Sequence, residues 1–179
     1  MEMLFGIIGI IVVVVLLYGI GTYNQFIRVK NKVDEALSGI DVALAKRYAI
    51  LTNLVEVVKG YVQHEHEVLV SLVKLRNGNM VNRVEVDQNQ LLAKEQLFAL
   101  QEAYPELKAN EQFLSLQTAI QDVEEHLAAS RRMYNSNVSI YNDLVLSFPS
   151  NLIGNMINAG KMEYFNAKEE ERENINITL

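Results

Sequence analysis

The pattern of hydrophobic and polar positions begins with a long apolar run near the N-terminus. No charged residue occurs from Met3 to Ile27, and Leu4 to Tyr18 consists almost wholly of Leu, Phe, Ile, Val and Gly. As a helix rising about 1.5 Å per residue, this run is long enough to cross a hydrocarbon core of roughly 30 Å. We therefore expect a transmembrane anchor over residues 1–27. The side chains expected inside the bilayer include Leu4, Ile8, Ile11, Val14, Leu17 and Tyr18.

A cleaved signal peptide and a buried core helix are the alternatives for this run. A signal peptide has a basic leading region and a small-residue cleavage site, whereas this chain begins Met1-Glu2 and no Ala-x-Ala follows. A buried core helix still has a polar face and is usually shorter. The run is therefore interpreted as an anchor.

Basic residues follow the span directly and none precedes it. Arg28, Lys30 and Lys32 come just after the apolar run. Basic flanks remain on the cytoplasmic side of a membrane, while acidic residues count for little. We expect a single-pass protein of the cell membrane, with its N-terminus outside and its main domain in the cytoplasm.

Beyond the span, apolar residues recur at helical spacing with charged residues between them, which predicts long amphipathic helices. The first stripe is Val33, Leu37, Ile40, Leu44, Leu51, Leu54, Val58 and Val62. It ends at a turn signal, Asn77-Gly78-Asn79. A second stripe is Phe113, Leu116, Ile120, Val123, Leu127, Ser130, Tyr134, Asn137, Tyr141 and Leu144.

The segment between these two stripes predicts a further helix. Asp87 and Gln90 have capping-box spacing, so this helix is expected to run from Asp87 to about Ala103. Pro105 marks a break, and the last long helix is expected from Glu106 to Phe148. The fold class is therefore all-α, an antiparallel bundle of about four helices over residues 28–147 that follows the transmembrane helix. A hairpin of two very long helices is the alternative.

Residues 148–179 are expected to form an apolar segment followed by a charged tail. If the last long helix runs antiparallel to the first, it ends near the bilayer, and the uncharged segment after it suits the membrane surface. The membrane-surface candidates are Phe148, Leu152, Ile153, Met156 and Ile157. The alternative is that this segment folds back and covers the open end of the bundle.

Two pairs of asparagines lie seven residues apart, Asn24 with Asn31 and Asn135 with Asn142. This spacing places both members of a pair on one helix face, and antiparallel packing would let the pairs meet. Buried asparagines in a helical seam fix the register of packing at some cost in stability. A register role is therefore favoured over a ligand site.

Candidate chemistry changes this picture little. The chain has no Cys, and its net charge of −6 with no basic stripe argues against nucleic acid as a partner. His64 and His66 point away from each other on a helix, so a zinc site is not expected. Lys46-Arg47 and Arg131-Arg132 are expected as surface charge or salt-bridge partners. We expect no catalytic residue, cofactor, metal or small-molecule substrate.

Several segments, taken together and in order, resemble the LemA family of membrane-anchored helical proteins of bacteria. They are Tyr23-Asn24 with Arg28-x-x-Asn31-x-Val33, Ile40-Asp41-Val42-x-Leu44, Arg47-Tyr48-x-x-Leu51-x-Asn53-Leu54-Val55-Glu56, Val58-Lys59-Gly60-Tyr61-x-x-His64-Glu65, Tyr104-Pro105-Glu106-Leu107-Lys108-Ala109-Asn110, Arg132-x-Tyr134-Asn135 with Tyr141-Asn142, and Phe148-Pro149-Ser150-Asn151-Leu152-Ile153. The resemblance implies one N-terminal span and a helical bundle, and it does not imply an enzyme. Some members of the family are linked to shaping or organising membranes, including those of magnetosomes. The family usually has a proline where Thr52 stands, so one continuous first helix is favoured here over a break between Tyr48 and Asn53.

Two functional hypotheses follow. The first is a non-enzymatic, membrane-anchored scaffold that forms homo-oligomers and organises or remodels the lipid bilayer. The second is a membrane-tethered adaptor that binds a partner membrane protein or protease through the bundle.

Overall fold

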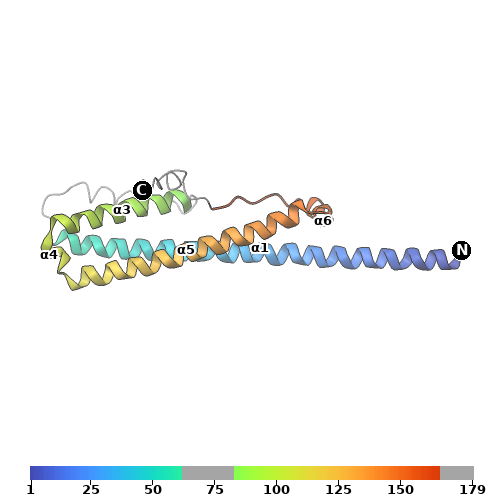
Figure 1. Ribbon diagram of the computed structural model, residues 1–179, viewed down its shortest axis with the longest axis horizontal. Coiled ribbons are helices and arrows are strands. Elements are labelled where there is room, and N and C mark those ends of the chain that lie inside the picture. The colour runs from blue at the N-terminus through green and yellow to red at the C-terminus, as the bar shows by residue number, and fades with distance from the viewer. Residues whose placement is uncertain (62–82, 166–179) are drawn as a thin grey trace, which may run out of the picture. The chain divides into compact units, whose positions relative to one another are not determined.

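A computed structural model describes residues 1–61 and 83–165 of the chain. In these ranges the regular structure is helical, which confirms the predicted all-α class (Figure 1). The elements are α1 (Glu2–Lys59), α3 (Arg83–Ala103), α4 (Pro105–Lys108), α5 (Glu111–Leu146) and α6 (Ser150–Met156). The turn predicted at Asn77-Gly78-Asn79, the His64 to Glu67 cluster and the charged tail lie outside the described residues.

Helix α1 continues through the position where the family usually has proline. The hydroxyl of Thr52 donates a hydrogen bond of 2.9 Å to the carbonyl of Tyr48, one turn earlier in the same helix. Thr52 and Asn53 have low helix propensity, but both are exposed, so neither places a polar side chain in the core. The expectation of one continuous first helix is confirmed.

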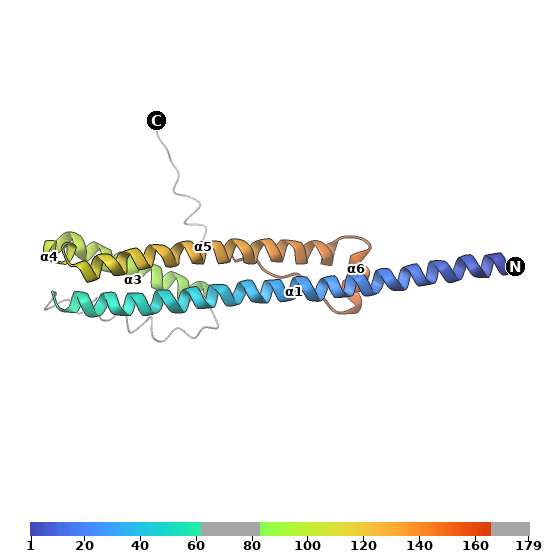
Figure 2. The ribbon, with the colours of Figure 1, turned by 90° about the horizontal axis from the view of Figure 1, so that it is seen from below.

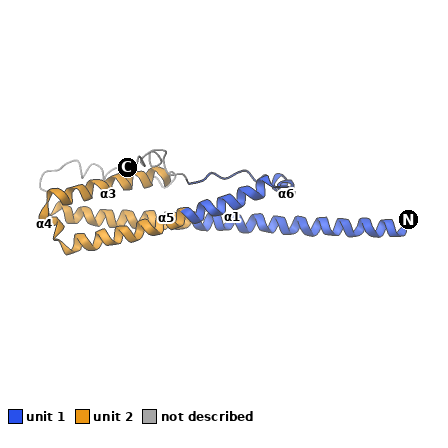
Figure 3. Ribbon diagram, viewed as in Figure 1, with its two compact units in different colours: residues 1–36, 132–179 blue, residues 37–131 orange. Residues whose placement is uncertain are grey.

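The chain forms two compact units, and both α1 and α5 contribute to each (Figure 3). Unit 1 comprises residues 1–36 and 132–179, and unit 2 comprises residues 37–131.

In unit 2, the second part of α1 and helix α3 run in the same direction, and α5 runs opposite to both (Figure 2). Their apolar stripes meet in a core that includes Leu51, Leu54, Leu97, Phe113 and Ile120, each at most 1% exposed. Of the two stripes predicted from the sequence, Ile40, Leu44, Leu51, Leu54 and Val58 on α1 and Phe113, Ile120, Val123 and Leu127 on α5 are buried in this unit. They share a helix face because positions three and four apart lie on one side of a helix.

The chain enters α5 through a cap that the sequence analysis did not predict. One helix had been expected from Glu106, but the short α4 ends at Lys108 and α5 starts at Glu111. The side-chain oxygen of Asn110 accepts a hydrogen bond of 2.9 Å from the backbone N–H of Phe113. The Asn110 amide also donates to the hydroxyl of Tyr61 at 2.8 Å. The bond from Phe113 to Asn110 satisfies one of the backbone donors that a helix start leaves unpaired.

Asp87 does not cap α3, which corrects the predicted helix start. The helix begins one turn earlier, at Arg83, and Asp87 lies inside it. The Asp87 side chain accepts hydrogen bonds from arginine instead of capping a backbone N–H. The capping-box spacing of Asp87 and Gln90 therefore has a different cause, since both side chains contact Arg47 of α1.

Unit 1 is built around an aromatic contact between α1 and α5. The rings of Phe26 and Tyr141 meet edge to face, with centroids 5.9 Å apart. Val29, Val33 and Val138 complete the buried cluster. Helix α6 and the extended segment after it pack onto this cluster through Ile153, Ala159 and Met162, among others.

Candidate functional site

In the part of α1 before Thr22, which we call the bare part, no residue is buried. An 18-residue window of this helix is apolar enough to cross a membrane, and 0% of it is buried. Counting from the N-terminus, the first buried side chain is Thr22. The six side chains predicted to lie in the bilayer are 46% to 65% exposed. Residues 3–20 would span about 27 Å as a helix, close to the thickness of a hydrocarbon core.

Helix α6 lies against α1 at the point where the bare part ends. A Cβ placed on Gly19 would lie 3.8 Å from Cδ1 of Ile153. A Cβ placed on Gly154 would lie 3.2 Å from Cζ of Phe26, so the absence of a side chain there permits the close approach of α6 to the ring. These two contacts fix α6 beside residues 19–26 of α1.

The five membrane-surface candidates divide between two faces of this segment. Ile153 is half-buried and packs onto the core of unit 1. Phe148, Leu152 and Met156 are 80%, 55% and 78% exposed, and Ile157 is also at the surface. The segment thus covers the end of the core with one face, as one alternative predicted, and leaves large apolar side chains on the other.

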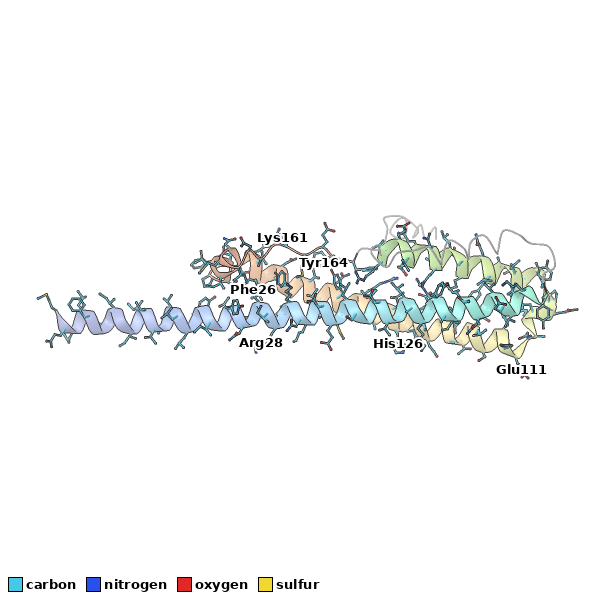
Figure 4. The ribbon with its side chains drawn as sticks, turned by 180° about the vertical axis from the view of Figure 1, so that it is seen from behind. Phe26, Arg28, Glu111, His126, Lys161 and Tyr164 are labelled. Atoms are coloured by element: carbon cyan, nitrogen blue, oxygen red, sulfur yellow. The ribbon has the colours of Figure 1, made fainter. Side chains whose placement is uncertain are left out.

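Exposed basic residues follow both the span on α1 and the apolar segment of α6 in the sequence. Arg28, Lys30 and Lys32 are exposed on α1, and Lys161 is the first charged residue after α6. Figure 4 shows Arg28 and Phe26 on different sides of α1, so that the aromatic ring faces the core and the guanidinium faces outward. The surface therefore changes from apolar to basic within a few residues of α6.

The asparagine pairs do not meet, which corrects the prediction for them. Asn24 and Asn31 are exposed on α1. Asn135 and Asn142 of α5 instead bind the backbone of the extended segment that follows α6.

Each of these two α5 asparagines makes a pair of hydrogen bonds to one residue of that segment. Asn142 donates to the carbonyl of Met162 at 2.9 Å and accepts from its N–H at 2.8 Å. Asn135 donates to the carbonyl of Phe165 at 3.0 Å and accepts from its N–H at 2.8 Å. The hydroxyl of Tyr134 adds a bond to the carbonyl of Glu163. We call residues 161–165 the strap, because these contacts hold it along α5; the register role assigned to the four asparagines stays a prediction.

Arg47, expected as surface charge or as a salt-bridge partner, is a salt-bridge partner inside unit 2. Its side chain is 1% exposed and pairs with Asp87 at 2.5 Å and Glu124 at 3.2 Å. Its Nε donates to the side-chain oxygen of Gln90 at 2.7 Å. The predicted salt-bridge role is confirmed, and its burial is an additional finding. The sequence carried a signal for this, since Arg47 occupies the stripe position between Leu44 and Leu51.

Unit 2 also has a shallow groove of about 410 Å³ between α1 and α5. Its wall includes Gly39, Val42 and Lys46 from α1, with His126 and Ser130 from α5. At one point of this wall the two helices approach closely, since a Cβ on Gly39 would lie 3.2 Å from the Ser130 hydroxyl oxygen. Among residues 1–61 and 83–165, no three His, Cys, Asp or Glu side chains gather as a metal site would require.

The bare apolar helix, the helical units and the apolar surface of α6 define a class: membrane-associated, all-α proteins. Residues 36–179 match the sequence profile of the LemA family, and the chain belongs to that family. The chain is similar to the protein LemA of Metamycoplasma hominis, at 27% identity over 161 residues, 86% of this chain and 73% of the relative. It is also similar to the magnetosome protein MamQ of Magnetospirillum gryphiswaldense, at 20% identity over 177 residues, 82% of this chain and 65% of the relative.

Proposed function

We propose that this protein is a non-enzymatic, membrane-anchored scaffold that self-associates and organises or remodels the bilayer. The observation that carries this proposal is the sharp change along α1 from a bare apolar helix to a packed core at Thr22. Such a helix needs lipid around it, because nothing in residues 1–61 and 83–165 buries its side chains over a length of about one bilayer core. The partners proposed are the lipid bilayer and further copies of the chain, without a cofactor.

The glycines of the span support self-association, and the name of a relative supports a membrane role. Gly6 and Gly9 lie in the bare part of α1, and a Cβ on either would meet no atom within 4 Å. Small residues on a membrane helix allow another helix to approach closely. The name of one relative assigns it to the magnetosome, and this supports a role in organising membranes.

The test is the mass and shape of the full-length protein in mild detergent and in nanodiscs, by light scattering and electron microscopy. We expect a particle of several 20.3-kDa chains. The double variant Gly6→Ile, Gly9→Ile should shift the mass distribution downward, whereas Gly160→Ile, also in open space, should leave it unchanged. A monomer at high protein concentration would contradict the scaffold proposal.

The groove in unit 2 favours the adaptor as a second candidate function. Its apolar wall and the flanking Lys46 and His126 suit an apolar peptide that carries an acidic group. Pull-down from native membranes would separate the two functions, because an adaptor recovers a second protein at fixed stoichiometry. Val42→Glu, at a groove residue 69% exposed, should abolish that recovery, and Leu114→Glu, at an exposed position outside the groove, should not.

A further inference from the structure

We propose that α6 and the turn before it form a second membrane contact, which inserts Phe148, Leu152 and Met156 among lipid headgroups. The partner is the bilayer in which α1 is anchored. This inference rests on the membrane anchoring in the proposed function and adds where, and by which side chains, the rest of the protein enters the lipid.

The position of α6 along α1 is the first step of the argument. Its contacts with Gly19 and Phe26 place it beside the residues where the bare part of α1 ends. With the bare part in the hydrocarbon core, residues 19–26 lie at the boundary between hydrocarbon and water. A segment packed against them lies at the same depth, in the interfacial layer.

The side chains of α6 are the second step. Leu152 and Met156 are four residues apart and lie on one helix face, and Phe148 precedes the helix in the adjoining turn. All three are more than half exposed, although Ile153 and Gly154 of the same segment pack inward. Interfacial helices bury an apolar face at the boundary of headgroups and acyl chains, and the exposed side of α6 offers such a face.

The charge pattern is the third step and favours lipid over a protein partner. No charged residue occurs from Leu144 to Gly160, so nothing in this stretch opposes entry into the interface. Lys161 comes directly after this stretch, and Arg28 comes directly after the span on α1. Both are exposed and can contact the phosphates of anionic lipids. Tyr18 and Ile20, on either side of the Gly19 that α6 contacts, are exposed apolar residues as well. One lipid surface therefore accounts for both exposed regions.

The test uses tryptophan as a depth probe, because the chain contains none. Phe148→Trp and Met156→Trp are made in the full-length protein, and Leu114→Trp, at a residue 44% exposed in unit 2, is the control. Each is reconstituted in nanodiscs that contain anionic lipid, with and without lipids brominated on the upper acyl chain. Interfacial helices bury their apolar face about 5–10 Å into the boundary of headgroup and acyl chain, within reach of the bromines.

We expect blue-shifted emission and strong quenching by brominated lipid at positions 148 and 156, and neither effect at position 114. In the Phe148→Trp background, adding Leu152→Ser and Met156→Ser should reduce the quenching, because the rest of the face no longer favours insertion. Both added residues are exposed, so the core of unit 1 stays intact, and circular dichroism checks the fold.

Two results would overturn the inference. Water-like emission with no quenching at position 148 would show that the segment stays in solution. Blue-shifted emission without quenching by brominated lipid would show that protein, such as a second copy, covers this face. Light scattering of the same nanodiscs measures self-association separately, so the scaffold proposal and the inference can fail independently.

Discussion

At the scale of single residues, Arg47 shows how a charge can occupy a core position. The guanidinium is planar and presents five N–H donors, which lets it bind several acceptors at once. Asp87, Gln90 and Glu124 provide acceptors from two other helices, and the carbonyl of Asp87 accepts a further bond at 2.9 Å. Arg131 also pairs with Asp87, and Lys94 with Glu124, so neither carboxylate depends on Arg47 alone.

Replacing Arg47 with Met should destabilise unit 2 by about 3 kcal/mol, toward the lower end of the range for breaking a buried ion pair. The cost arises because Asp87 and Gln90 lose partners in a place from which water is largely excluded, while Arg131 and Lys94 retain part of the compensation. Urea unfolding of the full-length protein in detergent, followed by circular dichroism, measures the change.

The matched control for Arg47 is Lys59→Met. Lys59 pairs with Glu56 at 2.7 Å, but these side chains are 44% and 66% exposed. An exposed pair of this kind contributes at most about 1 kcal/mol. Equal loss of stability in the two variants would refute the role assigned to Arg47.

Residue-level prediction failed where a side chain's partners come from a distant part of the chain. Asp87 and Gln90 have the spacing of a helix cap, but their partner is 40 or more residues away. Asn135 and Asn142 share one helix face, as expected from the sequence, but bind a backbone segment that carries no sequence signal. Spacing reports which residues share a face, and it does not report what that face meets.

At the scale of elements, the periodicity of apolar residues predicted the long helices correctly, because a helix that buries one face must place apolar residues three and four positions apart. The stripes through Ile40, Leu44 and Leu51 on α1, and through Ile120, Val123 and Leu127 on α5, are the buried ones. Helix ends were predicted less well, since α3 starts earlier and α4 separates from α5. Those ends depend on single hydrogen bonds such as that of the Asn110 cap, which are weak signals in a sequence.

The strap is the element whose stability rests most clearly on side-chain amides. Changing both Asn135 and Asn142 to Ala removes four hydrogen bonds to its backbone, each worth about 0.5–1.5 kcal/mol. The amides of Met162 and Phe165 should then exchange with solvent at least about tenfold faster, since about 1.4 kcal/mol corresponds to a factor of ten. Trypsin should also cleave more rapidly after the exposed Lys161.

The control for the strap is Asn137→Ala on the same helix. The side chain of Asn137 donates a hydrogen bond of 3.0 Å to the carbonyl of Lys32 on α1 and not to residues 161–165 of the strap. Its removal should leave exchange at Met162 and Phe165 unchanged. Hydrogen exchange measured by mass spectrometry compares the variants, and equal protection in all of them would show that packing alone holds the strap.

At the scale of the whole molecule, the basic residues after the span predict that the helical units lie in the cytoplasm. The chain has no Cys, so single introduced cysteines report on topology without background. Val42→Cys, at a position 69% exposed, should react with an impermeant maleimide only after cells are permeabilised. Glu2→Cys should react in intact cells, and the reverse pattern would invert the proposed orientation.

The boundary at Thr22 also determines how the anchor responds to lipid composition. The helix before this residue is bare and the helix after it is packed, so a thicker bilayer cannot draw in more of α1 without breaking the core of unit 1. The mismatch must be met by a smaller tilt or by local thinning of the lipids, at fractions of a kcal/mol per Å. Helix tilt measured in bilayers of graded chain length would show this directly. The protein would then sort among membranes by their thickness. The packing of α6 against α1 would set the length of α1 that must match the hydrocarbon core.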